Sequence, residues 1–225
     1  MRLVFTDPLL EFNLNCLTPW TIVIENRELF TLFTGDLWNQ CNGKPGRFIF
    51  SDDEKELSLE KKADFIFNIF DISCNGKKLL NKIYAELSEI SNDELQIELH
   101  EVNSRIVSFL DLLSNKLPYE LAFDLEPDII GLFKAYNMRI DEDEEGATDK
   151  IVSYIRLSHQ ALGTELIIFI NLRQFFEDKD IELIYEACKY EQVCVIDIEG
   201  NDSGVRLSDE RCVIIDRDYC IINLD

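Results

Sequence analysis

An apolar repeat runs through the middle of the chain and dictates much of its local structure. Leucines and isoleucines recur at steps of three and four from residue 80 to residue 90. A second series with the same steps runs through Leu95, Leu99, Val102, Ile106, Phe109 and Leu113. This spacing places the apolar side chains on one stripe of a helix and is typical of helices that pack lengthwise on a partner. The repeat predicts two consecutive amphipathic helices within residues 75–119.

The two predicted helices meet at a possible turn. Ser91 is followed three residues later by Glu94, which fits the capping box that starts many helices. A tight turn here would fold the second helix back on the first, so we expect an antiparallel helical hairpin. Two ordinary core helices are the alternative, because a long apolar seam requires a partner surface without identifying it.

The segments on either side of the repeat have the pattern of an α/β domain. TIVIE (21–25) is a β-branched run, and apolar residues at helical spacing follow it over 25–40. RFIFS, ELSL and ADFIFNIF then look like strands. Beyond residue 165 the strand ELIIFI, the helix DKDIELIYEACKY and the strand VCVIDI alternate, and CVIIDRDYCII suggests a terminal hairpin.

These patterns predict an α/β fold with an inserted helical part. We expect a P-loop/RecA-like head formed by residues 1–74 and 120–225, and a helical leg formed by residues 75–119. The phosphate-binding signature GxxxxGK[ST] is absent, as are GxSxG and HExxH, and the chain has two histidines. A nucleotide-binding site would lack its main electrostatic support, so we expect a protein that is not an enzyme. A divergent metal-dependent nuclease or a degenerate P-loop enzyme is the less favoured alternative.

The charge balance bears on possible partners. The chain has 44 acidic and 22 basic residues, a formal net charge of −22. This excess repels polyanions at long range, although a basic face or bound divalent cations can offset it locally. The seven scattered cysteines include no CxxC pair and indicate a reducing compartment. No stretch approaches the roughly 20 apolar residues of a membrane span. We therefore expect a cytoplasmic protein without membrane contact.

The segment PYELAFDLEPD (118–128) concentrates four carboxylates, Glu120, Asp124, Glu126 and Asp128. Pro127 is expected in the first turn of a helix that runs to about residue 137, where flanking acids favour the positive end of the helix dipole. That role does not explain Glu120 and Asp124. Calcium accepts six to eight oxygen ligands in irregular geometry, so an acidic loop of this kind also suits calcium, although the spacing is not that of an EF-hand.

Six ordered segments together resemble one protein family, the DNA-end-binding ring proteins of type II-A CRISPR adaptation, which act in spacer acquisition. The segments cover nearly the whole chain and carry no catalytic signature. They are ENRELFTLFTGDLWNQ, DDEKELSLEKKADFIFNIFDI, KKLLNKIYAELSEI, KLPYELAFDLEPDIIGLFKAYNMRI, LIIFINLRQFFEDKDIELIYEACKYEQVCVIDIE and IIDRDYCII.

The resemblance implies a homotetrameric ring that threads double-stranded DNA ends. It also implies calcium ions near the junction of head and leg, for which the four carboxylates Glu120, Asp124, Glu126 and Asp128 become candidate ligands. The CRISPR integrase complex and the type II effector nuclease are the implied partners. A protein-interaction scaffold of the same pathway, with little direct contact to DNA, is the main alternative.

Basic residues must then contact the DNA. A duplex carries one negative charge per ~1.7 Å of its axis, so a ring that holds it needs inward-facing cations. The matching segment GLFKAYNMRI contains the first candidates, Lys134 and Arg139. The next candidates are Lys61, Lys62, Lys44 and Arg47. Each can instead be an exposed solubilising charge. Phosphate contacts position DNA without reading its sequence, so the expected binding is independent of sequence and sensitive to salt.

Overall fold

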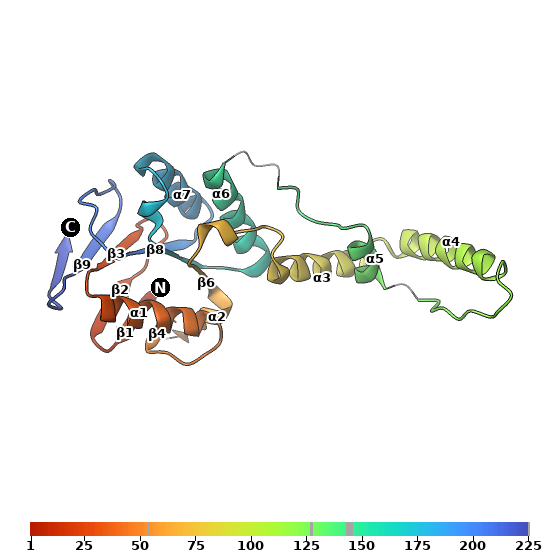
Figure 1. Cartoon of the computed structure of the whole chain (residues 1–225), viewed down its shortest axis with the longest axis horizontal. Coiled ribbons are helices and arrows are strands. Elements are labelled where there is room, and N and C mark those ends of the chain that lie inside the picture. Colours follow the sequence, from red (N-terminus) through yellow and green to blue (C-terminus); the bar gives the residue numbers. More distant parts are fainter. Residues whose placement is uncertain (54, 127, 143–145, 225) are drawn as a thin grey trace. The chain divides into compact units, whose positions relative to one another are not determined.

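The computed structural model describes every residue except 54, 127, 143–145 and 225. The chain divides into two compact units (Figure 1). The first contains Met1–Cys74 and Glu142–Asp225, and the second contains Asn75–Asp141. Residues 120–141, which we expected to return to the head, therefore belong to the second unit. Among the described residues no helix is both long and apolar enough to cross a membrane.

The first unit is a mixed α/β structure with a six-stranded sheet in the order β10-β9-β3-β8-β7-β6. The strands are β3 (Trp20–Ile24), β6 (Ala63–Ile66), β7 (Leu166–Ile170), β8 (Cys194–Glu199), β9 (Arg211–Ile215) and β10 (Ile221–Leu224). All neighbours pair in parallel except β10, which pairs antiparallel with β9 and confirms the predicted terminal hairpin. Every residue of β7 and β8 is buried, because both faces of a parallel sheet are covered.

Helices cover both faces of this sheet (Figure 1). Helix α1 (Arg27–Cys41) packs on one face through Leu29, Phe33 and Leu37, which confirms the helical spacing predicted for 25–40. Helices α6 (Ala147–Leu157) and α7 (Asp178–Tyr190) bury their isoleucines on the opposite face. A π-helical turn, η2 (Ser158–Leu162), extends α6, and a 3-10 turn, η3 (Leu172–Gln174), links β7 to α7.

A second, antiparallel sheet packs against the buried face of α1 and shares the core on that side of the six-stranded sheet. Its order is β2-β1-β4-β5, from β1 (Arg2–Thr6), β2 (Leu9–Asn13), β4 (Phe48–Asp52) and β5 (Lys55–Glu56). The Phe33 ring of α1 meets the rings of Phe5 and Phe48 at centroid distances of 5.0 and 4.8 Å. The strand predicted for ELSL is wrong beyond Glu56, because a short helix, α2 (Leu59–Lys62), and the turn η1 (Ile69–Asp71) flank β6.

The first turn of α1 follows directly on β3 without a glycine-rich loop. The Asn26 side-chain oxygen accepts hydrogen bonds from the amides of Glu28 and Leu29, each at 3.0 Å. These amides would otherwise face solvent at the positive end of the helix. A side chain of the protein therefore occupies the donors that a phosphate group uses at a helix N-terminus.

A buried polar cluster lies between the sheet and the connection from β8 to β9. Arg173, in η3, has a side chain that is 7% exposed, and its guanidinium binds Glu210 Oε2 and lies 3.7 Å from Asp197 Oδ2. The Arg173 amide donates to Glu199 Oε1 at 2.8 Å. One arginine thus faces three buried carboxylates. A buried charge is tolerated only when it is paired and hydrogen-bonded, so these contacts hold the β8–β9 connection on the sheet.

The Asp197 carboxyl makes the stability of this cluster depend on pH. Burial, and then the neighbouring Glu199, raise the pKa of Asp197 well above its ordinary value of 3.8. The folded protein therefore keeps a proton that the unfolded chain loses, so stability falls as pH rises from about 4 through the raised pKa. We expect Asp197→Asn, which mimics the protonated form, to flatten this fall by about 1 kcal/mol or more between pH 4 and 7. Denaturant unfolding at pH 4 and at pH 7 measures the loss of stability between them, and the exposed Asp218→Asn variant is the control. If the stability of Asp197→Asn falls with pH as steeply as that of the original protein, Asp197 is not the group responsible.

The second unit is helical throughout its regular structure. It contains α3 (Lys77–Asp93), α4 (Gln96–Ser114) and α5 (Ile129–Ala135). The Tyr84 ring of α3 lies 5.7 Å from the Phe133 ring of α5, and the Tyr84 hydroxyl donates to the Met138 carbonyl at 2.5 Å. Asn75 exchanges two hydrogen bonds with the backbone of Ile140. These contacts fix residues 129–140 on α3, which explains why residues 120–141 join this unit instead of the head.

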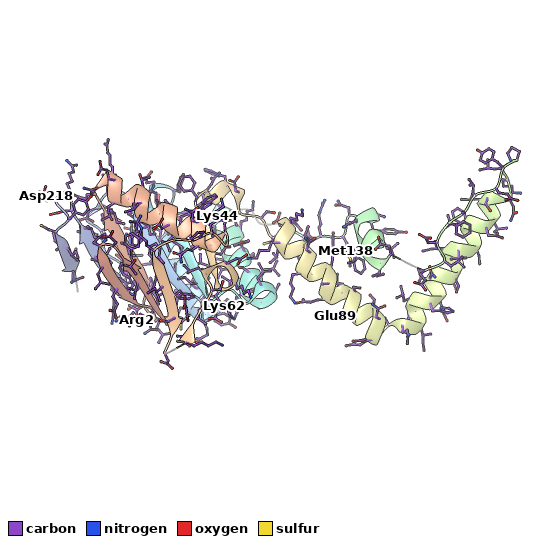
Figure 2. All side chains as sticks on the ribbon, turned by 90° about the horizontal axis from the view of Figure 1, so that it is seen from below. Arg2, Lys44, Lys62, Glu89, Met138 and Asp218 are labelled. Carbon is purple, nitrogen blue, oxygen red and sulfur yellow. The ribbon has the colours of Figure 1, made fainter. Side chains whose placement is uncertain are left out.

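The predicted helical hairpin is wrong, although both helices exist. Helix α3 continues through Ser91, whose hydroxyl donates to the Leu87 carbonyl at 2.7 Å and caps nothing. Helix α4 begins after Leu95, has no side-chain cap, and contains no buried residue. Figure 2 shows that α4 extends away from the end of α3 with side chains projecting on all sides. The face of α3 that was expected to hold α4 is partly used by α5 instead.

Candidate functional site

The four carboxylates predicted as calcium ligands lie in the second unit and are exposed. Asp128 caps α5, because its Oδ1 accepts the Gly131 amide at 2.8 Å. A Cβ on Gly131 would lie 2.5 Å from Asp128 Oδ2, so the glycine leaves room for this cap. The helix starts at Ile129, two residues later than expected, and Pro127 lies outside the described residues.

Two of the four carboxylates share a hollow. Glu126 and Asp128 line it beside α3 and α4, where the other polar lining residues are Ser88, Asn92, Gln96, His100 and Asn103. Carboxylate, amide and hydroxyl oxygens are donors that calcium accepts, so the chemistry of this lining fits a calcium ion. The geometry does not complete such a site. Across the residues that the structure describes, no three His, Cys, Asp or Glu side chains converge as metal ligands, and Glu120 and Asp124 are not part of the lining.

The first-choice DNA contacts, Lys134 and Arg139, lie on the segment that α3 holds. Lys134 is in the last turn of α5, and Arg139 stands between Met138 and Ile140, whose backbones bind Tyr84 and Asn75. Both cations are exposed and form no ion pair with a described residue. Their backbone is anchored while their charge faces solvent, which is a favourable arrangement for a phosphate contact.

Two further cations join this region of the second unit. Lys77 and Lys78 occupy the first turn of α3, are exposed, and have no ion-pair partner within the described part of the chain. Because Asn75 binds Ile140, the start of α3 lies close to the segment that carries Arg139. Sequence reasoning missed these lysines. The adjacent pair KK after NG was the available signal, but nothing in the sequence placed it near residue 139.

The four residues predicted as further DNA contacts lie in the first unit and differ in whether each already pairs with a carboxylate. Arg47 Nε binds Asp36 at 2.7 Å, and Lys62 binds Glu165 at 2.5 Å. Lys44 lies 4.9 Å above the Trp38 ring, a cation–π contact that leaves its charge uncompensated. Lys61 is exposed and, within the described residues, has no ion pair. Figure 2 places Lys44 and Lys62 on this unit. Arg47 and Lys62 therefore have less charge available for phosphate than Lys44 and Lys61.

Helix α4 presents an apolar stripe that the described part of the chain leaves largely exposed. We call the residues Leu99, Val102, Ile106, Phe109 and Leu113 the α4 seam. Val102, Phe109 and Leu113 are 47%, 59% and 49% exposed. A contiguous apolar stripe of this length is rarely left in water and marks a surface for protein association.

Comparison with known proteins identifies the family of the chain. The sequence model of one family, described as CRISPR-associated protein (Cas_Csn2), matches residues 40–219, which include all of the second unit and most of the first. The CRISPR-associated protein Csn2 of Enterococcus faecalis is 26% identical to this chain over 169 residues, covering 71% of this chain and 73% of that protein. The family resemblance identified from the six sequence segments is thereby confirmed. The chain belongs to the Csn2 family of CRISPR-associated proteins.

Proposed function

We propose that this protein is a DNA clamp of CRISPR adaptation. In this proposal four copies form a ring that binds double-stranded DNA ends without reading their sequence, and calcium supports the binding-competent form. The clamp supports the acquisition of new spacers, together with the CRISPR integrase complex and the type II effector nuclease. The observation that carries the proposal is the exposed, anchored pair of cations Lys134 and Arg139 in a chain with a net charge of −22.

The first unit supports a binding role over a catalytic one. We propose that its parallel sheet, with α1 following β3, is a P-loop/RecA-like core. In a nucleotide-hydrolysing core of that kind, free amides at this point cradle phosphate. Here the Asn26 side-chain oxygen accepts hydrogen bonds from the amides of Glu28 and Leu29, and the Glu28 carboxylate lies in the first turn of the helix. An anionic phosphate at this point would meet a filled donor site, and the carboxylates of Glu25 and Glu28 offset the charge of the neighbouring Arg27 and Arg217.

The second unit supports assembly. We propose that it is the leg of the subunit and that the α4 seam packs against other copies of the chain. Apolar residues at three- and four-residue steps match the requirement of helix-on-helix packing, and the described residues leave most of them exposed. Burial of the seam would remove an exposed apolar stripe from water and contribute about 25 cal/mol for each Å² of apolar surface.

Calcium enters the proposal through the hollow that contains Glu126 and Asp128. These two carboxylates and the amide oxygens of Asn92 and Gln96 are the residues that would hold the ion. Bound calcium would supply positive charge in an acidic region, which reduces the repulsion of a polyanion. Glu120 and Asp124 remain proposed ligands that would have to come from a rearranged segment.

Lys134 and Arg139 carry the first direct test of DNA contact. We expect the double variant Lys134→Gln, Arg139→Gln to weaken DNA binding and to lower the slope of log affinity against log salt by about two for each subunit that contacts DNA. The physical reason is that fewer counterions are released when two phosphate contacts are lost. Titrations of a linear duplex by fluorescence anisotropy, between roughly 50 and 200 mM salt, measure the slope.

The matched control for this test is Arg47→Gln, Lys62→Gln, which removes two cations that already pair with carboxylates. We expect this control to change the slope by less than half as much. Equal slopes for all three proteins would contradict the role of Lys134 and Arg139. A loss of slope in the control alone would move the DNA contact to the first unit.

A further inference from the structure

A small acidic cavity lies beside α7 in the first unit, and none of its lining residues is a candidate for contact with DNA, calcium or another subunit. Its volume is about 190 Å³. One side is apolar and is formed by Leu17, Pro19 and Leu207. The cavity lies against the same β8–β9 connection that Arg173 holds on the sheet.

The charge in this cavity is unbalanced. Four carboxylates line it, from Glu182, Glu186, Asp209 and Glu210, against the single lysine Lys189. Lys189 already pairs with Asp209 at 3.8 Å. Glu182 and Glu186 project from adjacent turns of α7 and have no ion pair within the described part of the chain. The lining thus has an excess of negative charge that an additional cation can neutralise.

One carboxylate oxygen in the wall has no hydrogen-bond partner among the described residues. Glu210 uses Oε2 to bind Arg173 and Thr21, but no described residue forms a hydrogen bond with its Oε1. The Glu210 side chain is 1% exposed. A buried polar atom without a partner costs about 1–3 kcal/mol, so this oxygen favours a guest that donates hydrogen bonds.

We propose that this cavity binds an alkylammonium group. A protonated primary amine has three N–H donors and no acceptor, which suits a wall of carboxylates and an unpartnered Glu210 oxygen. Its carbon chain suits the apolar side formed by Leu17, Pro19 and Leu207. The volume is several times the ~30 Å³ that one water molecule occupies in the liquid, so a short aliphatic amine fits.

The covered position of Glu210 Oε1 bears on how the guest enters. Ser208 and Asp209 are exposed, and they neighbour Glu210 in the cavity lining. In this proposal the ammonium reaches Glu210 Oε1 past these two residues, while Arg173 keeps the other oxygen. The same chemistry can come from a free diamine or from a lysine side chain of another protein. This inference does not depend on DNA binding.

The test measures amine binding to the full-length protein by isothermal titration calorimetry. The probes are 1,4-diaminobutane and Nα-acetyl-lysine amide, with 1,4-butanediol and sodium chloride of equal ionic strength as reference solutes. We expect binding of an amine and none of the diol. Binding of the diamine alone identifies a free amine as the guest, and binding of both probes identifies a lysine side chain as a guest as well. Absence of binding by both amines overturns the proposal.

Paired variants separate the cavity from general attraction to an acidic protein. Glu182→Gln, Glu186→Gln removes two exposed carboxylates from the cavity, and Glu98→Gln, Glu101→Gln removes two from exposed positions of α4. We expect the cavity variant to bind the amine about tenfold more weakly and the α4 variant to bind as the original protein does. Ser208→Trp, which adds bulk to the cavity lining without touching a charge, should also weaken binding. Equal weakening in the cavity and α4 variants overturns the proposal.

Discussion

Arg173→Leu is expected to lower the free energy of unfolding by about 3 kcal/mol. The leucine fills much of the same space but leaves Glu210 and Glu199 buried in an acidic cluster without the arginine that both of them face. It also removes the contacts from Arg173 to Val205 and Thr21 that hold the β8–β9 connection on the sheet. Removing one partner of a buried ion pair costs more than the pair contributes, because the remaining charge stays desolvated. Urea unfolding at pH 7 measures the change.

The control for Arg173 is an arginine whose ion pair faces solvent. The Arg2 side chain is 51% exposed and binds Glu11, itself 41% exposed, at 2.6 Å. We expect Arg2→Leu to change stability by no more than about 1 kcal/mol, as is usual for exposed pairs. Similar losses in both variants would show that Arg173 is not a special anchor of the connection.

Charge placed in the α4 seam is expected to break the oligomer. In Ile106→Glu, Phe109→Glu, assembly would bury two carboxylates with no cation to pair with them. Such burial costs several kcal/mol, and roughly 3 kcal/mol already corresponds to more than a hundredfold loss in association constant. Sedimentation velocity should therefore show species smaller than the tetramer. Because the proposed ring needs four subunits, the same variant should lose tight binding to DNA ends.

The control for the seam lies on the opposite side of the same helix. Ser104 and Ser108 are exposed there, one turn apart, and changing both to glutamate adds the same charge. We expect Ser104→Glu, Ser108→Glu to remain assembled. A tetramer that survives the seam variant would contradict the role of α4. Loss of assembly in both variants would indicate a general effect of charge.

The elements that sequence predicted well are those with a strong local signal. The runs LIIFI and CVIDIE are fully buried strands, and helix α7 follows the apolar period of DKDIELIYEACKY. The residues of β1 and β2 have no comparable individual prediction, because their partners, each other and β4, are set by tertiary pairing. ELSL shows the same limit, since Leu59 begins a helix in spite of its strand-like pattern.

The prediction of a helical hairpin was wrong because the sequence shows the apolar seams of the two helices but not the surfaces against which they pack. Helical spacing correctly predicted α3 and α4, but an apolar seam does not state whether its partner lies in the same chain. The decisive contacts come from Phe133 and Met138, which bind Tyr84 from more than 45 residues away. The hydroxyl of Ser91 had an acceptor inside α3, so the apparent capping box did not end the helix.

For the candidate site, the sequence likewise predicted some features correctly and could not show others. The sequence supplied the correct residue types, and the alternative reading of Asp128 as a helix cap is confirmed by its bond to Gly131. It did not show that Glu126 and Asp128 share a hollow while Glu120 and Asp124 lie outside its lining. Nor did it show that Arg47 and Lys62 are paired, because their partners Asp36 and Glu165 are 11 and 103 residues away.

The central claim is that the assembled protein captures DNA at its ends and that calcium supports this. It is tested most directly by a mobility-shift comparison of linear and relaxed closed circular DNA of equal length, in calcium and then in excess chelator. We predict a shift of the linear form, little shift of the circular form, and loss of the linear shift on chelation. The reason is that a net charge of −22 for each subunit repels DNA along most of the surface and leaves entry from an end as the open route. Equal binding of both forms, unchanged by chelator, would contradict the clamp.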